Sequence, residues 1–147
     1  MFREAHALWQ GGPYAGQGTV STASRLLSNA PYALGTVALR PFTTPYELLA
    51  ASLASSMAVT LAQEMARLSI KPSEVDTHVA LMFDDLMDPE KITSAHLRIT
   101  ARSHHAQSDR FQAAVEAARR ACAIWNALKL NLTCEAELIS APEPALL

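Results

Sequence analysis

Cysteine is scarce in this chain, which limits the chemistry available to it. Among the 147 residues there are two cysteines, Cys122 and Cys134, and their wide separation is not a metal-binding spacing. The opening segment, MFREAHALWQGG, lacks the long apolar stretch of an export signal. We therefore expect a cytoplasmic protein whose thiols stay reduced, with no bound metal and no other cofactor.

An excess of charge of either sign is also missing. The net charge is −2 and only 18% of the residues are charged, so no basic surface for nucleic acid and no acidic tail is predicted. The longest weakly polar run, Leu48–Leu61, is interrupted by serines and is too short to span a bilayer. We expect no nucleic-acid partner and no membrane association. The length and the balanced composition predict one soluble domain covering residues 1–147.

The hydrophobic pattern predicts the element order βββ-α-ββ-α-β. Apolar residues alternate with polar ones in the strands and recur with helical spacing in two longer segments. Strands are expected near 5–9, 18–27, 34–39, 76–83, 92–102 and 129–139. We expect Asn29-Ala30-Pro31 to connect two of them, and the acidic segment 84–91 to connect two others. Strands grouped in runs indicate an antiparallel α+β fold.

Both helices have recognisable starts. Thr44-Pro45-Tyr46-Glu47 has the form of a capping box, with Thr44 as N-cap and Glu47 bonding back to it, and the helix is expected to reach about Leu68. Ser108 is the predicted cap of the second helix. An apolar face continues along that helix through the following residues: Phe111, Val115, Ala118, Cys122 and Trp125.

The first helix has almost no polar face. No residue between Leu48 and Leu61 is charged, and a helix that is apolar all round is normally buried all round. A chain of this size can hardly bury a central helix completely by itself. We therefore expect a homodimer in which the partner covers part of this helix.

Three segments stand out in the chain: GQGTVSTAS (16–24), TTPYELLAA (43–51) and ACAIWNAL (121–128). In combination and in this order they resemble the OsmC/Ohr family, the osmotically inducible and organic hydroperoxide resistance proteins, although no one of them is specific alone. The resemblance runs from Ala5 to about Leu138. It implies an intertwined homodimer with long central helices between curved antiparallel sheets.

The resemblance also implies a thiol chemistry, in which a reactive cysteine reduces an organic hydroperoxide and becomes a sulfenic acid. A second cysteine then forms a disulfide with it, while an arginine held by a glutamate stabilises the thiolate. Carried across, the second cysteine falls on Cys122. The reactive cysteine falls on Ser56, the glutamate on Tyr46, and the arginine, in the simplest ungapped alignment, on Val37. A shifted alignment would instead bring Arg40 or Glu47 into these roles.

Three of the four positions therefore depart from the family pattern. A serine hydroxyl has no counterpart of the thiolate–sulfenate–disulfide cycle, so the peroxidase activity is predicted to be lost or to follow an altered route. The alternative is a non-catalytic protein that binds a small apolar or peroxidised molecule at the dimer interface, in a pocket lined by Val37, Tyr46, Ser56 and Cys122. A collapsed pocket filled by neighbouring side chains is the competing expectation.

The remaining polar candidates have simpler explanations. The scattered histidines His6, His78, His96, His104 and His105 lack metal-ligand spacing. The acidic residues Asp84, Asp85, Asp88 and Glu90 lack the alternation of a calcium loop and are expected to form a solvated turn. Ser56 has no surrounding nucleophile motif. Cys134 is expected to be a core residue, as is Cys122 without its partner thiol.

Overall fold

The computed structural model describes residues 1–34, 41–104 and 108–142. The chain forms two compact units, Met1–Leu49 and Ala50–Leu147. One three-stranded sheet belongs to each unit, and helices accompany the second sheet, so the α+β class expected from the sequence is confirmed. Whether these two units form the single domain predicted over residues 1–147 depends on how they join, and the single domain stays a prediction.

The first unit is an antiparallel sheet of β1 (Ala5–Gln10), β2 (Gln17–Thr22) and β3 (Ala30–Tyr32), in that order. Trp9 lies opposite Gly18, and Gly18 lies opposite Tyr32. The two aromatic rings face each other over the glycine, with their centroids 5.6 Å apart. Because Gly18 has no side chain, the rings of the outer strands can approach across the middle one.

Two strand predictions in this unit were wrong in position. β2 ends at Thr22 instead of near residue 27, because the chain turns there: the amide of Arg25 donates to the Thr22 carbonyl, and Arg25 has a positive φ of 63°. Ala30–Tyr32, expected in a connection, forms β3. Pro31 is tolerated because β3 lies at the edge of the sheet, where one amide is dispensable. The strand predicted at 34–39 falls, apart from Leu34, outside the described residues.

Helix α1 (Pro45–Arg67) begins as the sequence predicted. The amide of Glu47 donates to Thr44 Oγ1 at 3.1 Å, and the amide of Thr44 donates to Glu47 Oε2 at 2.9 Å. These reciprocal hydrogen bonds confirm the capping box and satisfy two amides that a helix start otherwise leaves unpaired.

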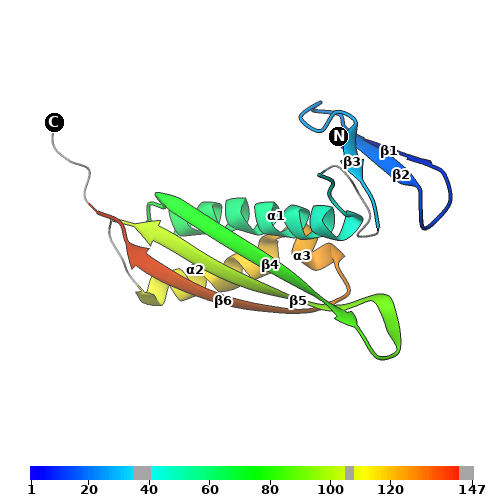
Figure 1. Cartoon of the computed structure of the whole chain (residues 1–147). Helices are drawn as coiled ribbons and strands as arrows, with labels where there is room; N and C mark the ends of the chain where they lie inside the picture. The colour runs from blue at the N-terminus through cyan, green and yellow to red at the C-terminus, as the bar shows by residue number, and fades with distance from the viewer. Residues whose placement is uncertain (35–40, 105–107, 143–147) are drawn as a thin grey trace. The chain divides into compact units, whose positions relative to one another are not determined.

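The second unit is a sheet of β4 (Glu74–Asp84), β5 (Asp88–Ser103) and β6 (Asn131–Ser140), with helices over one face (Figure 1). Those helices are α1, α2 (Ser108–Ala121) and the short α3 (Ala123–Ala127). Alternate β5 residues and one face of each long helix meet in an apolar core. Its fully or almost fully buried members include Leu53, Met57, Leu61, Met65, Leu97, Ile99, Phe111, Ala118 and Cys122.

The sheet differs from the prediction in two respects. β4 ends at Asp84 and β5 starts at Asp88, so most of the segment 84–91 is strand and not connection. β6 pairs with β5 in parallel, with Leu97 opposite Cys134, which corrects the expectation of a wholly antiparallel sheet. The reason is the intervening helical segment, which returns the chain to the end where β5 began.

The second predicted helix is also interrupted. α2 starts at Ser108, as expected, but it ends at Ala121, and Cys122 takes extended angles (φ −67°, ψ 114°) before α3 starts. The predicted apolar face holds through Cys122, whereas Trp125 belongs to the next helix. Helix propensity did not predict this break, because no glycine or proline is present at it.

Helix α1 buries one face within the second unit. Leu53, Met57, Leu61 and Met65 are fully buried, while the opposite face carries exposed small or apolar residues: Ala51, Ser52, Ser55, Val59 and Ala66. By length and composition this helix could cross a bilayer, a test that core helices of soluble proteins also pass. The expectations of a covering partner subunit and of no membrane association stay predictions.

Candidate functional site

Ser56 and Cys122 meet in the core of the second unit. They are 66 residues apart in sequence, and Ser56 Oγ lies 3.3 Å from Cys122 Sγ, within hydrogen-bonding distance for a sulfur pair. Ser56 comes from the middle of α1 and Cys122 from the break between α2 and α3. Cys122 is fully buried and Ser56 is half-buried. The structure thus brings together two of the four residues predicted for the site.

The break in the helix brings the start of α3 to the Cys122 side chain. Its amide still donates to the Ala118 carbonyl at 2.8 Å, as the last turn of α2 requires. Its sulfur accepts from the amide of Trp125 at 3.5 Å and so acts as the N-cap of α3. Cys122 therefore belongs to both helices, and its thiol lies where α3 begins and α1 passes.

Three residues around this pair were not predicted from the sequence as part of the site. Thr60 Oγ1 donates to the Ser56 carbonyl at 2.7 Å, one turn along α1. Trp125 supplies the capping amide, and its ring lies 5.2 Å from the guanidinium carbon of Arg119. The side-chain amide of Asn126 donates to the Cys122 carbonyl at 2.9 Å. The sequence does show a polar residue, Asn126, four positions after Cys122. Because a continuous helix was expected there, Asn126 was not interpreted as a contact of Cys122.

The assignments of the other two predicted positions, 37 and 46, stay predictions. Val37 and the alternative Arg40 lie outside the described residues. Tyr46 is half-buried in the first turn of α1, in the unit that ends at Leu49. Glu47 is engaged by the capping box, where its Oε2 also accepts from Thr43 Oγ1 at 3.0 Å. The capping role expected for Glu47 is thus confirmed, and the assignments of Val37 and Tyr46 stay predictions.

Two of the acidic residues accept hydrogen bonds from nearby amides, Asp84 at the β4–β5 turn and Asp88 at the start of β5, so the expected solvated turn is shorter than predicted. Asp84 Oδ1 accepts from the amide of Met87, and Asp88 Oδ1 accepts from the amide of Glu90. Within residues 1–34, 41–104 and 108–142, no group of three or more metal-ligating side chains comes together. His96 lies on the sheet surface, where it contacts Thr133 Oγ1 at 2.8 Å and Glu135 Oε1 at 3.5 Å.

Cys134 does not resemble a reactive thiol. It packs against the core from β6 and is partly buried, and this burial raises the pKa of the thiol above 9.0, the value of an unperturbed cysteine. Arg119 opposes the shift and Glu116 adds to it. Because the thiolate is the nucleophilic form, Cys134 is suited to packing and not to redox chemistry.

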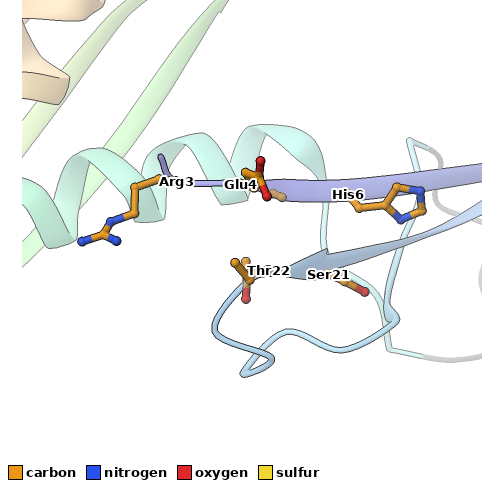
Figure 2. A pocket seen from close by; sticks show the side chains of 7 residues that line it. Arg3, Glu4, His6, Ser21 and Thr22 are labelled. Carbon is orange, nitrogen blue, oxygen red and sulfur yellow. The ribbon is translucent and has the colours of Figure 1, made fainter. Parts of the chain in front are cut away.

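A depression of about 570 Å³ lies along β1 and β2 in the first unit, between Arg3 and Ala23. Its side chains spread apart: Figure 2 shows Arg3 and His6 pointing toward opposite ends, with Glu4 and Thr22 on opposite sides of the strand. Binding sites for small molecules are concave and have convergent polar groups. The polar groups of this depression do not converge in the isolated unit, so the Ser56–Cys122 pair remains the stronger candidate.

The chemistry available to the pair follows from its atoms. A thiol opposite a second thiol at this separation could form a disulfide, but oxygen in place of one sulfur cannot. The hydroxyl and the thiol can exchange a hydrogen bond, in either direction. A serine–cysteine pair therefore has no disulfide chemistry of its own.

Comparison with known proteins identifies the family of the chain. The OsmC-like protein family matches residues 40–137, which is more than half of the chain. Peroxiredoxin OsmC of Escherichia coli is 26% identical over 141 residues, covering 95% of this chain and 99% of the relative. The chain therefore belongs to the OsmC-like family, as the resemblance indicated.

Solved structures support the same fold. An OsmC-like protein from Mycoplasma pneumoniae superimposes with a TM-score of 0.77 at 12% identity, covering 95% of this chain and 98% of the other. The organic hydroperoxide resistance protein OhrB of Bacillus subtilis gives a TM-score of 0.65 at 22% identity, covering 92% and 98%. By the names of its relatives, the family is associated with peroxiredoxins and hydroperoxide resistance.

Proposed function

We propose that this chain is an OsmC-like protein without the family's thiol-dependent hydroperoxide reductase activity. One observation supports the proposal most directly: the residue opposite Cys122, at 3.3 Å from its sulfur, is Ser56. Reduction of a hydroperoxide by two thiols yields an alcohol, water and a disulfide. Ser56 can neither become a sulfenic acid nor form that disulfide.

Cys122 is a poor substitute for the missing thiol. It is fully buried, and its sulfur is engaged by the amide of Trp125 and by Ser56. A thiol that attacks a hydroperoxide has to be accessible and largely ionised, in an electropositive and partly exposed surrounding. The Cys122 surroundings favour a structural role, which supports loss of activity over a change of route.

The direct test is a hydroperoxide reduction assay on pure protein with cumene hydroperoxide and a dithiol reductant. Wild type is expected to stay at the background of the Cys122→Ser variant. Enzymes typically turn over about 1–1000 times per second, so loss of activity is easily distinguished. A wild-type rate in that range, abolished by Cys122→Ser, would overturn the proposal.

Restoring the thiol is the constructive arm of this assay. Ser56→Cys places sulfur opposite Cys122, and measurable dithiol-dependent turnover is expected. The turnover of this single variant should stay well below that of the triple variant Ser56→Cys/Tyr46→Glu/Val37→Arg. The triple variant adds a cation, and a cation lowers the pKa of a nearby thiol. Ser56→Cys, Cys122→Ser is the matched control. Equal rates for the single and the triple variant would mean that positions 37 and 46 are misassigned.

In place of catalysis, we propose binding of an uncharged or weakly polar molecule at the inherited site, in a cytoplasmic homodimer. The exposed small-residue face of α1, which includes Ser52 and Ser55, supports it, because Ser56 lies at the edge of that face. Thermal unfolding with cumyl alcohol, the product of cumene hydroperoxide, tests binding without chemistry. A stabilisation that Ser56→Trp removes is expected, and unchanged unfolding across apolar alcohols would reject binding.

A further inference from the structure

Asn126 occupies the break between α2 and α3. Its side-chain Nδ2 donates to two carbonyl oxygens, that of Arg120 at 2.8 Å and that of Cys122 at 2.9 Å. Its own amide also donates to the Cys122 carbonyl, at 3.1 Å. One side chain thus joins the last turn of α2 to the first turn of α3, and Cys122 supplies one of its two acceptors.

These contacts replace hydrogen bonds that the helix break disturbs. In an uninterrupted helix the Arg120 carbonyl would accept from the amide four residues further on. At this break it accepts from the Asn126 side chain instead. The extended angles at Cys122 are therefore stabilised by a side chain, since no glycine or proline imposes them.

The backbone angles of Cys122 determine what lies beside its sulfur. Its φ of −67° is still that of a helix and only its ψ of 114° departs, so the break redirects α3 and brings the amide of Trp125 to the sulfur. In the observed conformation the sulfur caps α3 and reaches Ser56 on α1. We propose that Asn126 is a positioning residue, whose side-chain amide holds the α2–α3 break so that the residue at 122 faces the residue at 56.

This inference concerns the site described above and rests on the proposed function only in treating Ser56 and Cys122 as that site. It is tested without substrate, so its failure is distinguishable from failure of the proposed function. The background variant is Ser56→Cys, Cys134→Ser, which has one possible disulfide, between positions 56 and 122. Oxidised dithiothreitol takes two electrons and two protons from the two thiols, and the disulfide and reduced dithiothreitol form.

The equilibrium of that exchange measures how well the two sulfurs are held together. Asn126→Leu, which keeps the size of the side chain and removes its donors, is expected to lower the equilibrium constant for disulfide formation at least tenfold. That change corresponds to about 30 mV in reduction potential. Asn126→Gln, which retains the amide, should restore part of the loss. Asn126→Ser, too short to reach both carbonyls, provides the same test if the leucine variant does not fold.

Val115→Ala is the matched structural control. Val115 is buried on α2, and its truncation should lower the free energy of unfolding without moving the disulfide equilibrium. Equal equilibrium constants for the background variant and its Asn126→Leu derivative would overturn the inference. So would a loss in Val115→Ala as large as that in Asn126→Leu, or the absence of any 56–122 disulfide in the background variant.

Discussion

At the scale of single residues, the contacts of Gly18 explain why the first sheet tolerates no side chain at this position of its middle strand. Trp9 and Tyr32 lie opposite this residue on either side. A Cβ built at Gly18 would lie against the Tyr32 ring, closer than atoms in folded proteins approach. The aromatic pair and the glycine are therefore one packing unit, contributed by three strands.

Gly18→Ala is accordingly expected to destabilise the protein by about 1–3 kcal/mol, the usual cost of overpacking. Thermal or urea unfolding measures the effect. Gly12→Ala is the matched control, because a Cβ there has nothing within 4 Å. The change should be smaller when Tyr32→Ala is already present, since the ring is then gone. An equal cost in both backgrounds would show that the ring contact is not the cause.

At the scale of elements, the join between β5 and β6 carries a charged cluster on its exposed face. Glu135 on β6 contacts His96 at 3.5 Å and Arg98 at 3.2 Å, both on β5. Hydrogen bonding from His96 and then from Arg98 lowers the pKa of the Glu135 carboxyl below its usual 4.5. A carboxyl whose pKa is lowered by folding stabilises the fold at pH values above its unfolded-state pKa. This stabilisation is lost as the pH falls through the folded-state pKa.

Glu135→Gln should therefore lower the free energy of unfolding at neutral pH, and this effect should fade as the pH falls through the lowered pKa of Glu135. Urea unfolding of wild type and variant between pH 3 and 7 gives the difference. The effect will be small, since exposed ion pairs contribute little and salt screens them. Glu137→Gln removes a carboxylate from the same face of β6 as a control. A difference for Glu135→Gln that grows toward acid pH would contradict the assignment.

How far the sequence predicts these elements depends on whether the cause is local. The α1 cap follows from Thr44 and Glu47 alone, so the helix start was predicted to the residue. β3 was misplaced because Pro31 normally marks a connection, and its tolerance at a sheet edge depends on the strands around it. The α2–α3 break depends on Asn126 reaching back to carbonyls of the preceding turn, which hydrophobic periodicity does not detect.

The candidate site shows the same limit more sharply. No local pattern connects Ser56 with Cys122 across 66 residues, and their pairing was expected only through the family resemblance. The structure brings these two residues together, and neither Thr60 nor Asn126 was anticipated. Composition and periodicity predict which side chains are apolar and which face is buried. They do not predict which two polar atoms meet inside that core.

At the scale of the whole molecule, α1 presents two contrasting faces. Leu53 and Met57 are fully buried in the second unit, whereas Ala51, Ser52 and Ser55 are exposed in the single chain. Small residues on an uncharged helix face allow close approach of another backbone. Leaving such a face exposed to water does not stabilise the fold. The proposed homodimer would cover it, and the chain would then be an obligate dimer.

Ser52→Glu distinguishes a dimer from a monomer because the two states predict opposite results. In a monomer Ser52 is exposed, and a carboxylate there is harmless. In the proposed dimer the carboxylate is buried without a partner, which costs several kcal/mol and removes the soluble dimer. Ala113→Glu, on the exposed side of α2, adds the same charge elsewhere and should leave assembly intact. Sedimentation at micromolar concentration measures both variants, and a well-folded wild-type monomer would reject the dimer.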